Sequence, residues 1–135
     1  MIRDSAGDLY GTTEFGGAAG YGVVFKVDTA GRETVLYSFT GAADGGYPHS
    51  GVIRDSAGNL FGTTDQGGTT GHGVVYELNT AGRETVLYSF TGFADGGEPE
   101  AGVIQDSAGN LYGTTTSGGT AGKGAVFKLV LSCIN

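Results

Sequence analysis

The chain has 135 residues, of which 28 are glycine, two are proline and 16% are charged. Its net charge of −7, with seven scattered Lys and Arg, lacks the basic footprint that nucleic acid or an anionic membrane requires. The single cysteine, Cys133, excludes an internal disulfide, and no apolar run reaches the ~20 residues of a membrane span.

A repeat runs through the whole chain. IRDSAGDLYGTT at residues 2–13 returns, with few changes, at 53–64 and 104–115, so the period is 51 residues both times. Residues 2–50 match residues 53–101 at 34 of 49 positions. A fixed period of this length is typical of propellers, solenoids and related repeat folds. We treat the chain as one domain of three repeats, at 1–50, 51–101 and 102–135.

Each repeat holds four predicted strands, which in the second repeat are residues 51–54, 59–64, 73–78 and 84–90. All are short, rich in β-branched or aromatic residues and bounded by turn residues. The turns DSAGN and TAGR join them in pairs, with glycine supplying the positive φ of a tight hairpin. No helix is expected, because glycine interrupts every window and no 3.6-residue period is present. The third repeat lacks the fourth strand.

Apolar side chains are expected on both faces of these strands. In residues 73–78, Val74 and Tyr76 are predicted on one face, and Val75 and Leu78 on the other. In residues 84–90, one face is predicted to carry Val86, Tyr88 and Phe90. A sheet that is apolar on both faces is covered on both sides.

Propeller blades are covered in this way, and they hold four strands in ~40–50 residues. We therefore predict an all-β fold, namely a β-propeller fragment of about 2.7 four-stranded blades. A β-trefoil is the alternative, since it also has three four-stranded repeats in a chain of about this size and closes as a monomer.

An open arc of blades would leave one apolar face uncovered at each end, which is unfavourable in water. Head-to-tail association into a ring would cover both faces. Two copies would give about six blades and three copies about eight. We predict a homodimer, with a larger ring as the alternative.

The pattern DSAGNLYGTT, GGxxGxGVVFKL, LYSFTG and DGGxP, repeated in this order, resembles the GloVer tandem repeat of bacterial "choice-of-anchor" proteins over the whole chain. The segment GVIRDSAGNLFG is also similar to blades of NHL-type propellers, in which the first strand lies innermost and the fourth outermost. The resemblance implies an extracellular bacterial protein displayed on the cell surface, with no known catalysis. Met1 leads directly into repeat sequence, so we expect no signal peptide in this chain.

Two loops vary between repeats while the strands barely change. One reads EFGGAAGYG, DQGGTTGHG and TSGGTAGKG, and the other reads TGAADGGYPHSG and TGFADGGEPEAG. In propellers such loops meet on one face, where polar and aromatic groups would suit a sugar. Drift in solvated loops explains the variation equally well. The candidate ligand-binding residues are Phe15, Tyr21, Tyr47, His49, Gln66, His72, Glu98, Glu100 and Lys123.

Other polar residues are predicted to serve the fold. Asp4, Asp55 and Asp106 lack the calcium-loop spacing and are expected to cap turns. Asp44 and Asp95 are expected to be turn residues, with metal or ligand contacts as the alternative. We predict no catalytic residues, no metal site and no cofactor, because neither a nucleophile elbow nor a zinc or phosphate-loop spacing is present.

The sequence thus favours a non-enzymatic, self-assembling scaffold whose variable loops bind a surface glycan or a protein. The alternative is a metal-dependent propeller enzyme of the lactonase or lyase type.

Overall fold

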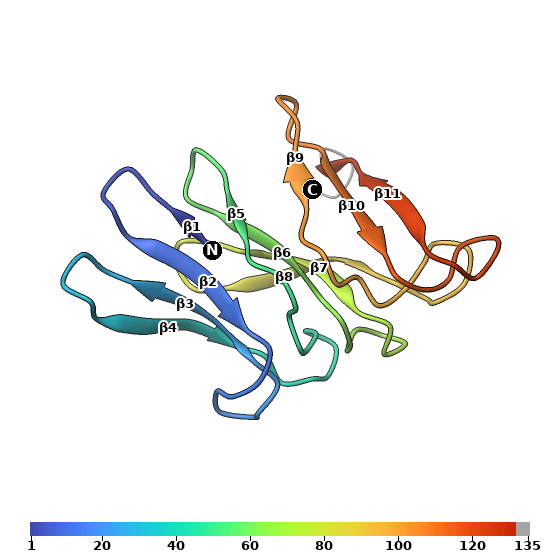
Figure 1. The fold of residues 1–135 in the computed structure, drawn as a ribbon, viewed down its shortest axis with the longest axis horizontal. Helices are drawn as coiled ribbons and strands as arrows, with labels where there is room; N and C mark the ends of the chain where they lie inside the picture. The colour runs from blue at the N-terminus through green and yellow to red at the C-terminus, as the bar shows by residue number, and fades with distance from the viewer. Residues whose placement is uncertain (132–135) are drawn as a thin grey trace.

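The computed structural model describes residues 1–131, which form eleven strands and no helix (Figure 1). Sheet 1 contains β1 (Ile2–Arg3), β2 (Leu9–Thr13), β3 (Val23–Val27) and β4 (Glu33–Ser38). Sheet 2 contains β5 (Ile53–Arg54), β6 (Leu60–Thr64), β7 (Val74–Leu78) and β8 (Glu84–Ser89). Sheet 3 contains β9 (Ile104–Gln105), β10 (Leu111–Thr115) and β11 (Ala125–Leu129). The all-β prediction is confirmed for these residues. Cys133 lies outside them.

Neighbouring strands in each sheet follow chain order and pair antiparallel. The register repeats with the sequence, because Leu9 pairs with Val27, Leu60 with Leu78, and Leu111 with Leu129. The observed strands begin up to two residues later than predicted, at Ile53, Leu60 and Val74 in the second repeat. The 51-residue period is therefore a structural repeat as well as a sequence repeat.

The aspartates that recur in each repeat cap the turns between the first two strands of each sheet. One Asp55 carboxylate oxygen accepts hydrogen bonds from the backbone N–H of Ala57 at 3.0 Å and of Asn59 at 2.8 Å. Gly58, between them, has the positive φ of 91° that the turn needs. Asp4 and Asp106 make the same two backbone bonds in their own repeats. The predicted turn-capping role is confirmed.

A β-bulge in β8 corrects one prediction about strand faces. Leu87 is an extra residue between Val86 and Tyr88, whose partners on β7 are the adjacent residues Tyr76 and Val75. Val86 consequently packs towards sheet 1, whereas Phe90 packs towards sheet 3. The three residues do not share a face, because the bulge breaks the strict alternation that the prediction assumed.

Leu78 also lies on the face opposite to the one predicted. Alternation along β7 places it with Val74 and Tyr76, and all three belong to the core between sheets 1 and 2. Val75 belongs to the core between sheets 2 and 3. Sheet 2 is therefore covered on both sides, as the sequence predicted, although the assignment of Leu78 was wrong.

The outer faces of sheets 1 and 3 are not covered within the described residues. Val126 of sheet 3 is 82% exposed, whereas Val24 and Val75 at the same repeat position are fully buried. On the outer face of sheet 1, Val35 is 49% exposed, while its counterpart Val86 is partly buried against the first core. The same apolar positions are thus buried between neighbouring sheets and exposed to solvent on the outer faces of sheets 1 and 3.

The segments that lead into the first strands lie against one another. A Cβ atom on Gly51 would come within 2.9 Å of the Met1 nitrogen, and one on Gly102 would come within 3.3 Å of the Gly51 carbonyl. The Thr12 hydroxyl donates to the carbonyl of Ser50 at 2.7 Å and thereby ties sheet 1 to this segment. The first-strand edges of the three sheets therefore meet, with β4 and β8 at the opposite edges.

Candidate ligand-binding loops

The variable loops gather at one end of the sheets, because Thr13, Val23 and Ser38 are register partners across β2, β3 and β4. We call residues 14–22, 65–73 and 116–124 the hairpin loops, and residues 39–52 and 90–103 the linkers. Each linker runs between two hairpin loops. Gly46 of the first linker exchanges backbone hydrogen bonds with Gln66, at 2.9 and 3.1 Å. Gly97 pairs in the same way with Ser117. The structure thus brings the predicted loops together.

Five of the nine predicted residues form a cluster around the first linker, which we call the aromatic cluster. Tyr47 lies at its centre, with its ring centroid 5.5 Å from Phe15 and 5.1 Å from Tyr21. His49 and Gln66 complete the set. Phe15 is 64% exposed, so one ring of the cluster is open to solvent.

A hollow of about 380 Å³ lies beside these rings, and its lining includes two acidic residues that were not predicted, Glu14 and Asp65. His49 Nε2 lies 3.5 Å from a Glu14 carboxylate oxygen and 3.7 Å from one of Asp65. The other Asp65 carboxylate oxygen is buried without a hydrogen-bond partner among the described residues. Burial raises the pKa of Asp65 above its ordinary value; the nearby His49 opposes this shift, and the charges of two neighbouring acids add to it. The repeat position reads Glu, Asp and Thr, a variation that could have identified both acids.

Two further predicted residues meet around the second linker. His72 Nδ1 lies 2.6 Å from a carboxylate oxygen of Glu98, and the Ser117 hydroxyl donates to the other oxygen. At the repeat position of Tyr47 the second linker has Glu98, so no phenol ring lies at the centre of this group. Glu100 is near enough for its charge to contribute to the raised pKa of Asp65, after burial and alongside Glu98. Lys123 is exposed, and no hydrogen bond or ion pair within residues 1–131 joins it to either group.

The linkers carry an unusual backbone at their centre. Tyr47 has φ of 56° and Glu98 has φ of 49°, and they are the two non-glycine residues with positive φ in the described part of the chain. Residues with a Cβ atom rarely adopt a positive φ. Those that do are concentrated at active sites and ligand-binding sites. Both positions were predicted site residues, which makes the linker centre the best candidate for binding.

The acidic turn residues are engaged in the linkers themselves. Asp95 accepts hydrogen bonds from the Thr91 backbone N–H at 2.9 Å and from the Tyr88 hydroxyl at 2.6 Å. The Thr91 hydroxyl donates to the other carboxylate oxygen, and although partial burial opposes ionisation, the three donors together outweigh it and hold the pKa of Asp95 at about 2. Asp44 makes the equivalent contacts with Thr40 and Tyr37. Residues 1–131 contain no group of three or more His, Cys, Asp or Glu that could hold a metal ion.

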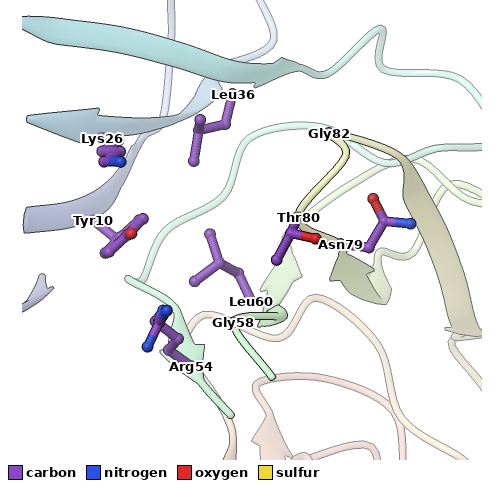
Figure 2. Close-up of a pocket in the computed structure, with 9 residues that line it drawn as sticks. All are labelled: Tyr10, Lys26, Leu36, Arg54, Gly58, Leu60, Asn79, Thr80 and Gly82. Atoms are coloured by element: carbon purple, nitrogen blue, oxygen red, sulfur yellow. The ribbon is translucent and has the colours of Figure 1, made fainter. Parts of the chain in front are cut away.

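A second hollow, of about 220 Å³, lies between sheets 1 and 2 at the opposite end, and none of the predicted residues lines it (Figure 2). Leu36 and Leu60 face each other across it, and the Tyr10 ring lies between the cationic ends of Lys26 and Arg54, at 6.0 and 5.9 Å. Lys26 Nζ lies 3.3 Å from a carboxylate oxygen in the turn between β1 and β2, that of Asp8. The Tyr10 hydroxyl donates to a second carboxylate of the same turn, that of Asp4, at 2.9 Å. These groups already engage one another, so we place the candidate site in the loops.

The described part of the chain is an all-β tandem repeat, in which successive antiparallel sheets hold variable loops together at one end. The family model of the Gloeobacter/Verrucomicrobia repeat matches residues 1–133, and the chain belongs to this family. The GloVer resemblance seen in the sequence is confirmed. Neither a curated protein nor a solved structure matches the chain. Residues 1–131 include no helix with the length and hydrophobicity to cross a membrane.

Proposed function

We propose that the chain is a non-enzymatic, self-assembling β-propeller segment. Three features support blades over a β-trefoil: the sheets are separate, they stack through their side chains, and their first strands meet at one edge. The close approach of Met1, Gly51 and Gly102 supports an arrangement in which the first strands lie innermost, around an axis. β4 and β8 then lie at the rim.

The proposal of self-assembly rests mainly on the exposure of Val126. The same position is 82% exposed in sheet 3 and fully buried in sheets 1 and 2, where the next sheet covers it. Burying a side chain of this size stabilises by about 1.5–3 kcal/mol. The outer face of sheet 1 offers a matching surface, since it repeats the face of sheet 2 that covers Val24.

A second copy of the chain would cover the outer faces of both sheet 1 and sheet 3. Sheet 3 of one copy packs on sheet 1 of the other, and the reverse contact closes the ring, so that two copies give about six blades. The contact is heterologous, and closure after two copies is what separates a dimer from a filament.

Two complementary charge variants test this arrangement. Val126→Glu and Val35→Lys each place a charge on one end face, at positions exposed in the single chain, so both variants should fold. Each variant alone should be monomeric. In an equimolar mixture one ring contact pairs Glu with Lys and the other is native, so the dimer should return.

Phe93→Glu is the matched control, because Phe93 is 77% exposed but lies in the second linker. This variant should remain dimeric. Loss of the dimer in the control, or no recovery in the mixture, would contradict end-face association.

We further propose that the aromatic cluster binds a carbohydrate. The family resemblance implies only the setting, a bacterial cell surface. Exposed aromatic faces stack on sugar rings, and carboxylate and amide oxygens accept hydrogen bonds from sugar hydroxyls. The hollow places Phe15 and Tyr47 beside Glu14, Asp65 and Gln66. A protein ligand is the alternative for the same loops.

A further inference from the structure

The hollow beside the aromatic cluster is acidic as well as aromatic. Its lining includes the carboxylates of Glu14 and Asp65 beside the rings of Phe15 and Tyr47. None of the residues that line it, all of them within the described part of the chain, is Lys or Arg. The chain as a whole carries a net charge of −7, so its field draws cations towards such a site.

The protein itself leaves the two carboxylates without a close cationic partner. His49 is the one basic side chain in the lining, and its Nε2 lies 3.5 Å from Glu14 and 3.7 Å from Asp65. Both separations exceed the roughly 2.7–3.2 Å of an N–H···O hydrogen bond. The second Asp65 oxygen is buried and has no hydrogen-bond partner in residues 1–131. Because a buried charge is unfavourable unless it is paired, a cationic ligand would stabilise this site.

The rings supply a second feature that suits a cation. Phe15 is 64% exposed, and its centroid lies 5.5 Å from that of Tyr47, in an edge-to-face contact that leaves much of the Phe15 ring open to solvent. Ammonium groups are attracted to aromatic faces within about 6 Å. They also form charge-assisted hydrogen bonds with carboxylates, which are about twice as strong as neutral ones. A neutral sugar hydroxyl gains neither of these effects.

The equivalent place in the next repeat does not offer this combination. Glu98, at the repeat position of Tyr47, is engaged by His72 Nδ1 at 2.6 Å and accepts a hydrogen bond from the Ser117 hydroxyl. Its carboxylate is therefore satisfied within the protein, and the phenol ring is absent from this position. We expect one cation-binding hollow per chain.

We propose that the aromatic cluster recognises amino sugars whose amine is free and protonated, in preference to neutral or N-acetylated sugars. This inference rests on the proposed carbohydrate-binding function of the same cluster. The sugar ring would stack on Phe15, and its ammonium would lie between the carboxylates of Glu14 and Asp65. A lysine side chain carries the same ammonium, but it lacks the rigid ring that stacks on an exposed aromatic face.

The test is a calorimetric titration of the full 135-residue chain with a glucosamine tetrasaccharide, in a slightly acidic buffer that keeps the amines protonated. The matched ligand is the same tetrasaccharide with every amine acetylated, which keeps the sugar rings and removes the charge. We expect saturable binding at one site per chain, at least tenfold tighter for the free-amine form. Added salt should weaken binding of the free-amine form and leave the affinity for the acetylated form unchanged.

Glu14→Gln removes one carboxylate and keeps the size of the side chain. Glu14 is 41% exposed, so this variant should fold. It should weaken binding of the free-amine tetrasaccharide at least tenfold, because a hydrogen bond between charged groups is lost, and change affinity for the acetylated form less than twofold. Glu33→Gln is the matched control, since Glu33 pairs with Val27 at the end of β4 that lies away from the loops. It should leave both affinities unchanged.

Equal affinity for the two tetrasaccharides, or equal effects of Glu14→Gln and Glu33→Gln, would overturn the preference for amines and leave the proposed carbohydrate function standing. Equal affinity for an N-acetylated tetralysine, which carries as many ammonium groups, would overturn the assignment to a sugar and favour a protein ligand. Failure of both tetrasaccharides to bind would also overturn the preference. A glycan array would then decide separately whether neutral sugars bind.

Discussion

Tyr47 and Glu98 occupy the same position in successive repeats, and both hold a left-handed backbone, with φ of 56° and 49°. In this conformation the Tyr47 N–H donates to the Tyr21 carbonyl at 2.8 Å, and the Tyr47 carbonyl accepts from the Asp65 N–H at 3.1 Å. Glu98 links His72 and Thr116 in the same way. One backbone geometry thus joins each linker to two hairpin loops, although the side chains at its centre differ completely.

The left-handed backbone predicts that a glycine at position 47 gives a more stable protein than an alanine, which is the reverse of the usual order. Tyr47→Ala and Tyr47→Gly both remove the ring contacts, but only glycine relieves the left-handed backbone, which disfavours other residues by roughly 1–2 kcal/mol. Tyr47→Gly should therefore be more stable than Tyr47→Ala by about 1 kcal/mol in urea unfolding.

Tyr21 provides the control, since it belongs to the same cluster and is not among the residues with positive φ. There the glycine variant should be less stable than the alanine variant by roughly 0.5–1 kcal/mol. The same sign at both positions would show that the linker backbone is not strained.

The buried carboxyl group of Glu84 predicts that stability falls as the pH rises from about 4.5 to about 8. One of its carboxylate oxygens is buried without a hydrogen-bond partner in the described residues, and burial, followed by the charge of Asp44, raises its pKa to about 8. The unfolded chain releases this proton near the ordinary value of 4.5. Between these two values the folded state binds more protons, so stability falls as pH rises.

Glu84→Gln should remove this decline. We expect the variant and the wild type to diverge between pH 5 and pH 9 by on the order of 1–2 kcal/mol, because solvent screens this partly exposed group. Urea unfolding across that range measures it. Glu33→Gln is the matched control, since Glu33 holds the same repeat position and is exposed. Parallel profiles for wild type and Glu84→Gln would refute the assignment.

Substitution of Asp55 measures how much one turn cap contributes to the free energy of unfolding. Asp55→Ala removes the acceptor for two backbone N–H groups and the Asn59 amide, so we expect a loss of about 1–3 kcal/mol in the free energy of unfolding. Asp55→Asn keeps one acceptor oxygen and should lose less. Equal stability of Asp55→Ala and wild type would show that the glycine alone holds the turn.

Phe15 is the sharpest test of carbohydrate binding. Phe15→Ala removes the most exposed ring of the aromatic cluster and should lower affinity for any glycan identified on an array at least tenfold. Because Phe15 is 64% exposed, the free energy of unfolding should change little. Phe93→Ala removes a ring that is 77% exposed and does not line the hollow, and it should leave glycan binding unchanged. An equal effect of both variants would locate binding elsewhere.

The strands and turns could be predicted because local signals agree in every repeat. The short turns, between the first two strands of each sheet and between the last two strands of sheets 1 and 2, each have an Asp or Asn cap and a glycine at positive φ. Each of these signals depends only on nearby residues. The bulge at Leu87 could not be predicted in this way. It depends on pairing with β7, and a two-residue period has no place for an extra residue.

The candidate site was predictable in part for a related reason. Variation between repeats identified Phe15, Tyr47 and His49, which do meet. It did not predict that a linker would lie between two hairpin loops, because that contact joins residues far apart in the chain. Asp65 was missed on this account, although its position also varies between repeats.

The most direct test of end-face association is the solution mass of the wild-type chain by light scattering, measured over a dilution series. We predict a mass of twice the 13.6 kDa of one chain, with dissociation only at the lowest concentrations. A stable, folded species of 13.6 kDa at every concentration would contradict the account, because the exposed valines of sheets 1 and 3 would then be tolerated in water.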